Sequence, residues 1–566
     1  MLTIALVVGM LAITVACVAL GERLHLPYPI LMLVVSAGIA FIPGMPHLTV
    51  ASEVILPLFL PPLLFATAQH TSWAVFRARW RTLVVLALGL TAVTAFVAAG
   101  AVWALVPGIG VPLALMLGAI VAPPDPIAVE AVAGPARMPR RLLTALQTEG
   151  LFNDAIAIVL FQAALGAVTR GEQLGPMIGV RFVIGAVLAV GVGFAIGWLF
   201  RMADRQVTSL AARTALGIVA PFAAYMLAEE IHASGVIAVV VTALETRRNS
   251  RPEDGELRIT RTSFWNVANL LVTGLAFGLI GAELRDVITD NTDLLHLTGI
   301  GLAVAAVTIA VRLLAMVVLH VATRGSMNRA PVDWRETIVL TWCGMRGLAT
   351  LALALAIPAS VPPEHRTMMV VVACTVLVVT LVPTGALLPW LLRVLHLQDD
   401  GRATREAVAE LSQRAQASAL TALKERLPEL HLPDEQKRAL VKRLKHLGRD
   451  LAPFSTLTGA IPTVTGGAST ENMPLPEVDP EEERMRRQRM RAARDLAVAA
   501  QTVALDAARA EVLAARSEVG IDPAAADLVL RRLDTRMMAA PPRLKAKHAT
   551  KATPRARGGA EGADRH

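Results

Sequence analysis

Long apolar runs alternate with short polar loops up to about Leu397. They fall at about residues 2–20, 27–42, 50–70, 82–106, 110–133, 142–168, 178–200, 212–229, 232–247, 262–284, 294–321, 335–358 and 366–396. A helix needs roughly 20 mostly apolar residues to cross a bilayer. The pattern therefore predicts an all-α polytopic membrane protein with about 13 transmembrane helices. Pro383-Thr384-Gly385 interrupts the last run, which leaves open whether it forms one segment or two.

After Gln398 the chain becomes charged and amphipathic, which predicts a helical cytosolic tail. We therefore expect two domains, a transmembrane domain over 1–397 and the tail over 398–566. Residues 453–479 are rich in Pro, Gly, Thr and Ser and are typical of a linker. Asp522-Pro523 predicts the start of a helix, because Asp can cap it and Pro fits its first position. The last residues are basic, and we expect them to be disordered.

The arginines of the membrane domain are distributed unevenly between the two sets of loops. If the N-terminus is outside, 18 lie in loops on the cytoplasmic side, and only Arg170, Arg181, Arg285 and Arg366 lie on the other. The 18 form six groups, at 23, 77–81, 137–141, 201–213, 247–261 and 324–335. Because cytoplasmic loops carry an excess of Lys and Arg, we expect the N-terminus outside and the C-terminal tail in the cytoplasm.

Composition agrees with this assignment and excludes several classes of protein. Hydrophobic residues make up 54% of the chain, charged residues 17%, and the formal net charge is +9. The basic excess follows the loops, so it indicates topology and no nucleic-acid partner. The three cysteines all lie in apolar segments without paired spacing, which predicts neither disulfides nor a metal site. Neither a nucleophile–base pair nor a nucleotide-binding loop occurs, so we expect no enzyme and no cofactor.

The fifth apolar run contains Ala122-Pro123-Pro124-Asp125-Pro126 near its middle. Three prolines in four positions cannot sit in an unbroken helix, because they lack a donor and clash with the preceding turn. Non-helical backbone at this depth is tolerated only inside protein or beside a water-filled cavity. Broken helices are the best sequence signal for a transporter's substrate site.

Four ionisable residues lie deep in apolar runs: Asp125, Glu149, Asp154 and Arg346. Such residues are costly in a membrane and mark functional sites by default. Arg346 stays charged and needs an anionic partner, for which Asp125 and Glu149 are the candidates. Asp154 is then left without a permanent counter-ion and must hold either a proton or a cation. Competition between the two on one carboxylate is sufficient for exchange.

Arg312 is a fifth case, in the run 294–321. Its long side chain could reach the cytoplasmic interface, or it could be buried in a pair with an acid. The sequence leaves these two alternatives equal.

Several motifs resemble those of the monovalent cation:proton antiporter-1 family, and they occur in order over about residues 20–397. These are Pro61-Pro62-Leu63-Leu64-Phe65, Asp125-Pro126-Ile127-Ala128-Val129, Leu151-Phe152-Asn153-Asp154-Ala155-Ile156, Ser234-Gly235-Val236-Ile237 and Gly344-Met345-Arg346-Gly347. The resemblance implies a bacterial cytoplasmic-membrane homodimer with inverted repeats and broken helices. It also implies electroneutral exchange of Na⁺, Li⁺ or K⁺ for H⁺ by an elevator-like motion.

The resemblance assigns roles to individual residues. Asp154 would bind the ion, Asn153 would support the site, and Asp125 would pair with Arg346, with Glu149 in the same network. The chain departs from the family at three positions, where Ala66, Pro124 and Gly150 replace Glu, Thr and Ser. All three changes remove side-chain oxygens, although the carbonyl of Pro124 is still available to an ion.

The cation therefore stays open. Water could complete the shell of a larger or partly hydrated ion such as K⁺, or other side chains could substitute. The candidates for substitution are Thr67, Thr148 and Glu130, although Glu130 fits better as a cytoplasmic-end residue near Arg137 and Arg140. Two alternative functions also remain: a proton-coupled carrier of another solute, and a membrane sensor with a regulatory tail.

Overall fold

The computed structural model contains helices and no strands in the part of the chain that it describes. That part comprises residues 2–24, 27–42, 52–70, 84–125, 128–130, 133, 136–150, 152–171, 175, 177–248, 254–289, 293–322, 331–399, 401–428, 434–451, 480–516, 518 and 521–538. The expected linker at 453–479 and the basic C-terminus lie outside it.

The contacts of the chain divide it into two units. One comprises Met1–Ser250 and Thr260–Arg402, and the other comprises Arg251–Ile259 and Ala403–His566. We call them the transmembrane unit and the tail unit. The short segment 251–259 was expected to be a loop of the transmembrane domain, but its contacts place it in the tail unit.

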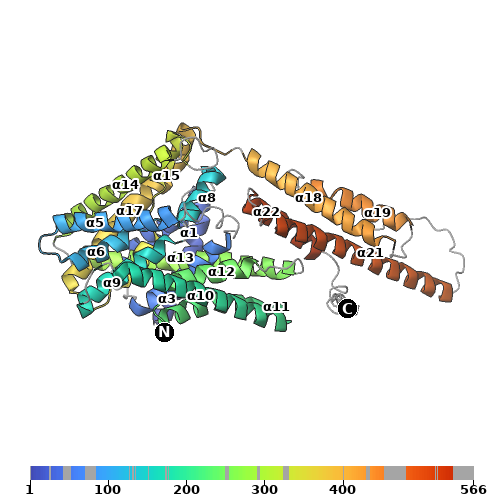
Figure 1. Ribbon diagram of the computed structural model, residues 1–566, viewed down its shortest axis with the longest axis horizontal. Helices are drawn as coiled ribbons and strands as arrows, with labels where there is room; N and C mark the ends of the chain where they lie inside the picture. The colour runs from blue at the N-terminus through green and yellow to red at the C-terminus, as the bar shows by residue number, and fades with distance from the viewer. Residues whose placement is uncertain are drawn as a thin grey trace, which may run out of the picture. The chain divides into compact units, whose positions relative to one another are not determined.

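The transmembrane unit is built from apolar helices packed side by side (Figure 1). In order they are α1 (Leu2–Leu24), α2 (Tyr28–Ala40), α3 (Ser52–His70), the π-helical η1 (Val84–Leu90), α5 (Thr91–Leu105), α6 (Val111–Val121), α8 (Arg140–Glu149), α9 (Asn153–Arg170), α10 (Met177–Gln206), α11 (Leu210–Glu230), α12 (Gly235–Arg248), α13 (Gly255–Thr289), α14 (Leu294–Ala322), α15 (Trp334–Trp342), α16 (Leu348–Leu355) and α17 (Pro363–Val394).

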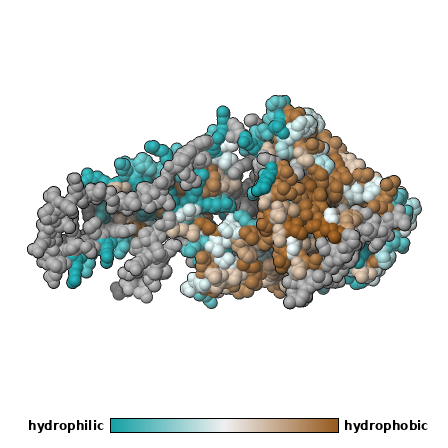
Figure 2. Space-filling view, turned by 180° about the vertical axis from the view of Figure 1, so that it is seen from behind, coloured by the Kyte–Doolittle hydropathy of each residue, from teal (hydrophilic) through white to brown (hydrophobic). Residues whose placement is uncertain are grey.

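Seven of the described helices are long and apolar enough to cross a membrane, and four shorter ones are also apolar. Apolar side chains on their outer faces are exposed, such as Val187 at 68% and Leu314 at 65%. Figure 2 shows this as a broad brown face on the transmembrane unit. So large an apolar surface on a water-soluble protein would cause association, whereas lipid covers it without cost. The count of 13 crossing helices remains a prediction.

Three of the apolar runs are broken in the middle. The helix α6 ends at Val121, and the residues that follow it, through Asp125, are not helical, as the prolines predict. Two further breaks were not expected, one between the end of α8 at Glu149 and the start of α9 at Asn153, and one between α15 and α16 at 343–347. Glycine lies at each of these two breaks, and it is among the poorest helix formers.

The last apolar run forms one helix, α17, in spite of Pro383 and Pro389 within it. Threonine hydroxyls donate to backbone carbonyls in the turns around the first proline. Thr384 donates to Thr380 O at 2.7 Å and contacts Trp342 O at 3.2 Å. Such side chains let a buried transmembrane helix tolerate proline. The possibility of two segments is therefore not realised.

The tail unit contains α18 (Arg402–Arg426), α19 (Asp434–Lys445), α20 (Leu447–Leu451), α21 (Pro480–Ala515) and α22 (Pro523–Met538). Leucine and alanine side chains form a core of its own. Leu411, Ala504 and Leu533 are examples, and each is fully buried. The start of α22 is as predicted, because Asp522 accepts a hydrogen bond from Ala524 N at 3.0 Å. The described surface of this unit is mostly hydrophilic (Figure 2).

Candidate functional site

The break after α6 and the break between α15 and α16 lie against each other. Asp125 N donates to Met345 O at 2.8 Å, and Arg346 Nε donates to Val121 O at 2.9 Å. In addition, Leu348 N donates to Asp125 Oδ2 at 2.9 Å. Each interrupted helix thus supplies partners for backbone groups that the other has left open. This exchange explains how non-helical backbone is stable in an apolar environment.

The carboxylate of Asp125 caps α16, since Leu348 is the first residue of that helix. A negative group is favoured there because it meets the unpaired N–H groups and the positive end of the helix dipole. Asp125 also accepts a hydrogen bond from Ala128 N at 3.3 Å, and it is 6% exposed. Gly347 makes the close approach possible, because a Cβ there would lie 1.8 Å from Asp125 Oδ2.

Arg346 is buried beside this crossing. Its guanidinium donates to the carbonyls of Val121 and Gly344, and its backbone N–H donates to Thr380 Oγ1 at 3.1 Å. Both carbonyls belong to residues at the ends of broken helices, where the last carbonyls lack helical partners. The positive charge therefore faces partial negative charges of the backbone. The direct pair with Asp125 that the resemblance implies stays a prediction.

Glu149 was expected in the charge network of Arg346, as one of its two candidate partners. It forms a buried ion pair with Arg312 of α14, with Nη1–Oε1 at 2.6 Å and Nη2–Oε2 at 3.1 Å. The two side chains are 6% and 4% exposed. Arg312 Nε also donates to Leu340 O at 2.9 Å. This decides between the two alternatives for Arg312 in favour of the buried pair. Two parallel N–H···O contacts are the geometry that a guanidinium favours with a carboxylate.

Asn153 links the break that follows α6 to the break between α8 and α9. Its amide nitrogen donates to Pro124 O at 2.6 Å, and its oxygen accepts from Asp154 N at 2.7 Å. The side chain is fully buried. Both ends of the amide are therefore engaged in holding the start of α9 against the proline break. The carbonyl of Pro124 accepts from Asn153, and its role as an ion ligand stays a prediction.

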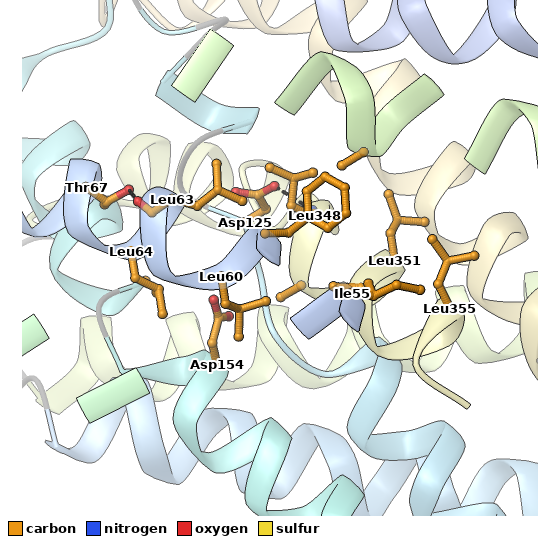
Figure 3. A pocket seen from close by; sticks show the side chains of 15 residues that line it. Ile55, Leu60, Leu63, Leu64, Thr67, Asp125, Asp154, Leu348, Leu351 and Leu355 are labelled. Atoms are coloured by element: carbon orange, nitrogen blue, oxygen red, sulfur yellow. Dashed lines mark hydrogen bonds between the residues drawn. The ribbon is translucent and has the colours of Figure 1, made fainter. Parts of the chain in front are cut away.

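Asp154 lines a cavity of about 40 Å³, more than the roughly 10–15 Å³ that one water molecule needs. The polar lining residues are Asp125, Asp154 and Thr67. The others are Ile55, Phe59, Leu60, Leu63, Leu64, Gly150, Ala276, Leu348, Ala349, Leu351, Ala352 and Leu355. Figure 3 shows both carboxylates next to the α3 residues Leu60, Leu63 and Leu64. The cavity thus combines acidic groups with an apolar wall.

Few of the described lining residues carry a side-chain oxygen. Thr67 Oγ1 donates to Leu63 O at 2.9 Å, which leaves its lone pairs available. Position 150 lines the cavity as glycine and offers no side-chain oxygen. Glu130 is exposed and is not among the described lining residues, which agrees with the interpretation as a helix-end residue. The side chain of Thr148 lies outside the described part.

Sequence reasoning did not find the apolar wall from α3 and α16, or Ala276 of α13. Leucine and alanine within an apolar run give no signal that they face a cavity. It named Glu149 as one of two candidate partners of Arg346 and did not find that its direct ion pair is with Arg312, because the sequence does not show which helices lie next to each other.

Comparison with known proteins identifies the family. The family described as "sodium/hydrogen exchanger, transmembrane" matches residues 9–394, well over half of the chain. The chain belongs to the sodium/hydrogen exchanger family. It is a multi-pass membrane protein.

Relatives of this family member support the assignment over most of its length. An uncharacterised Na⁺/H⁺ exchanger of Mycobacterium tuberculosis is 30% identical over 475 residues, which are 81% of this chain and 85% of the relative. The Na⁺/H⁺ antiporter ApNhaP of Aphanothece halophytica is 28% identical over 69% of this chain and 74% of its own. A sodium, potassium, lithium and rubidium/H⁺ antiporter of Bacillus subtilis is 29% identical over 64% of this chain and 57% of its own.

The fold is shared with the sodium proton antiporter MjNhaP1 of Methanocaldococcus jannaschii. The TM-score is 0.55 at 20% identity, over 69% of this chain and 98% of that one. This similarity confirms the predicted all-helical transporter fold.

Proposed function

We propose that the protein is a secondary active antiporter that exchanges a monovalent cation for H⁺ across the bacterial cytoplasmic membrane by alternating access. Family membership supports the reaction, since its relatives are named as Na⁺/H⁺ exchangers. The observation that supports the site is the position of Asp154 at the start of α9, on a cavity lined by both carboxylates. A cavity with negative groups favours a cation over an anionic solute.

Asp154 is the proposed carrier because the neighbouring acids are otherwise engaged. Glu149 pairs with Arg312, and Asp125 caps α16. Among the described residues, no Lys or Arg forms an ion pair with Asp154. Asp154 is half-buried, and its apolar surroundings penalise a charged carboxylate without a counter-ion, so a proton or a metal cation must neutralise it. The two ions then compete for one site, and each leaves when the other binds.

One exchangeable carboxylate supports one-for-one, electroneutral exchange. The scarcity of side-chain oxygens among the described lining residues supports a cation that keeps part of its water shell, for which the cavity has room. On this basis Na⁺, Li⁺ and K⁺ are all proposed substrates, with the larger ion favoured. The homodimer, the outside N-terminus and the cytoplasmic tail are part of the same proposal.

Transport in proteoliposomes tests it. With a pH-sensitive dye inside, addition of Na⁺, Li⁺ or K⁺ should dissipate a preset pH gradient, and Asp154→Asn should abolish the response. Glu364→Gln is the control, because Glu364 is an exposed carboxylate at the start of α17. Full activity of Asp154→Asn would refute the site. Proton movement in the absence of all monovalent metal cations would refute antiport.

A further inference from the structure

One face of α13 carries two polar side chains next to the ion cavity. Ala276 of this helix lines the cavity. Thr273 and Asn269 precede Ala276 by three and seven positions, and residues at these spacings lie on one face of a helix. Trp265, four positions before Asn269, packs on α3, and the ring centroids of Trp265 and Phe65 are 4.9 Å apart. This face of α13 is therefore turned toward α3 and the ion cavity.

The opposite face of α13 is closed by α1 and α2. Gly274 is two positions from Ala276, which is about 200° around a helix of 3.6 residues per turn. A Cβ at Gly274 would overlap the side chain of Thr14 in α1, and a Cβ at Gly281 would overlap that of Ser36 in α2. Packing this close fixes the rotation of α13 about its axis. The polar face is thereby held toward the ion cavity.

The oxygens on this face have no protein partner in the described part of the chain. Asn269 Oδ1 and Thr273 Oγ1 are buried and make no hydrogen bond there, and Thr273 is 1% exposed. Other threonine hydroxyls of the transmembrane unit donate to the carbonyl four residues earlier, as Thr67 and Thr375 do. Buried polar groups of folded proteins are nearly always paired with protein or with ordered water. Water or a cation is therefore the expected partner of these two oxygens.

Tyr28 of α2 shows that the polar face is close to a carboxylate of the ion cavity. Its side chain lies near enough to interact with Thr273, although without a hydrogen bond of normal geometry, and it is also influenced by the charge of Asp125. Asp125 lines the same cavity as Ala276. The two oxygens therefore lie in the field of a negative group, which favours a cation beside them over an anion.

We propose that Thr273 and Asn269 form a second subsite, for a partly hydrated monovalent cation, beside the Asp154 cavity. Along the helix axis Thr273 is about 4.5 Å from Ala276, and Asn269 is about 10.5 Å from it, at a rise of 1.5 Å per residue. Thr273 thus contacts the water shell of an ion at Asp154, and Asn269 holds the ion one step earlier. Hydroxyl, amide and water oxygens are the ligands that hard cations accept.

This subsite rests on the proposed cation/proton exchange and adds residues that handle its cation. It explains how the chain can replace part of a cation's water shell although Ala66 and Gly150 offer no side-chain oxygen. Neutral oxygens stabilise the ion without neutralising it, so the exchangeable charge stays with Asp154. Thr273 and Asn269 should therefore set the affinity for the cation and leave the number of protons exchanged unchanged.

Thr273→Val is the variant of choice, because it removes the hydroxyl and nearly keeps the shape of the side chain. In proteoliposomes it should raise the KM for Na⁺ or K⁺ by about 10-fold, the size expected for one contact to a charged group, with kcat within about 2-fold. Asn269→Leu should act in the same direction. Thr273→Ser retains the hydroxyl and should have the KM of the unmodified protein.

Thr308→Val is the matched control. Thr308 of α14 is also buried, but its hydroxyl already donates to Ala305 O at 2.9 Å. The KM of this variant for both cations should stay within about 2-fold of the unmodified protein. Thr273→Val breaks no hydrogen bond to the described protein, so its unfolding temperature without added cation should not fall. An unchanged KM for both cations in Thr273→Val would show a hydroxyl without a ligand and would overturn the subsite.

A thiol at position 273 tests the subsite without transport. In purified full-length protein carrying Thr273→Cys, a small cationic methanethiosulfonate reagent should react with the thiol, and Na⁺ or K⁺ should slow the reaction. The same reagent should not react in Thr308→Cys. The unmodified protein gives the background, because Cys17, Cys343 and Cys374 are all buried.

A thiol at position 273 that reacts no faster than one at position 308 would show that water and cations do not reach this face, and would overturn the subsite. A reaction that neither cation slows would show a hydrated face without a cation site, and would overturn it as well. A lack of cation-dependent proton movement in the unmodified protein would instead refute the proposed function. Protection of the thiol would still report on the subsite in that case, so the two failures are distinguishable.

Discussion

Two acidic residues only five positions apart on the chain have opposite surroundings. Glu149 ends α8 and is held by both terminal nitrogens of Arg312. Asp154 lies in the first turn of α9 and faces a cavity that it shares with Asp125 and a wall of leucines. The first carboxylate is permanently neutralised by protein, whereas the second depends on a mobile ion. The difference shows how one broken helix can carry both a structural acid and a transporting acid.

The largest expected effect is on the free energy of unfolding, and it distinguishes the structural acid Glu149 from the transporting acid Asp154. Glu149→Gln leaves Arg312 buried without its carboxylate, which should destabilise the membrane domain by about 3–5 kcal/mol. Asp154→Asn should leave the unfolding temperature unchanged and abolish exchange. Thermal unfolding in detergent measures the first effect and vesicle transport the second. Adding Arg312→Gln to Glu149→Gln should recover much of the stability. A double variant as unstable as Glu149→Gln would contradict the claim that these two charges mainly compensate each other.

A second prediction concerns the crossing that holds Asp125 in place. Gly347→Ala introduces a Cβ where Asp125 Oδ2 now lies, so the carboxylate must leave the N-terminus of α16. We expect a loss of about 1–3 kcal/mol, as for other overpacked cores, together with impaired exchange. Gly100→Ala is the control, because a Cβ there would meet nothing within 4 Å. Equal unfolding temperatures for the two variants would contradict the close packing of Gly347 against the Asp125 carboxylate.

A third prediction sharpens the description of the Asp154 cavity as poor in oxygens. Ala66→Glu with Gly150→Ser adds side-chain oxygens at a buried position and at a lining position. The ratio of Na⁺ to K⁺ activity should then rise by about 10-fold, which corresponds to about 1.4 kcal/mol. Rates with each cation in proteoliposomes measure the ratio. A ratio that stays constant would mean that protein oxygens at these positions do not select the ion.

The smallest effect is expected where a pair is exposed. Glu518 lies in the tail unit and contacts Arg414, with Oε1–Nη2 at 2.7 Å. The hydrogen bond from Arg414 lowers the pKa of the Glu518 carboxyl from its ordinary 4.5, and the nearby positive charge adds to this. A lowered folded-state pKa means that the pair stabilises the tail above about pH 4.5 and loses this effect as pH falls through the folded value.

Glu518→Gln should therefore lower the unfolding temperature of the tail slightly at pH 7 and not at all in strong acid. Solvent screens such a pair, so the shift should be far smaller than that of Glu149→Gln. Thermal scans at a series of pH values measure it. A shift as large as that of Glu149→Gln would break the contrast between buried and exposed pairs.

The sequence predicted those features that depend on one segment at a time. Apolar runs predicted the helices, and three prolines around Asp125 predicted the break after α6. The depth of Asp154 in its run singled it out as a candidate. Features that depend on which helices are neighbours were not predictable in the same way. The sequence left Arg312 ambiguous and left Glu149 as one of two candidate partners of Arg346, because pairing between α8 and α14 leaves no trace in the spacing of residues.

The same reason explains two other omissions. The breaks between α8 and α9 and between α15 and α16 contain glycine but not the proline cluster that marked the first break. The segment 251–259 resembled a cytoplasmic loop, and only its contacts place it in the tail unit. Charge alone does not distinguish an arginine that faces solvent from one, such as Arg258, that is half-buried in an ion pair with Asp534.

The central claim is that a proton and a metal cation compete for the Asp154 carboxylate. The most direct measurement is proton release from purified protein in weakly buffered detergent when Na⁺ or K⁺ is added. The account predicts that the unmodified protein releases protons as the cation binds and that Asp154→Asn releases none. Equal release from Asp154→Asn would contradict it, because the exchanged proton would then come from another group.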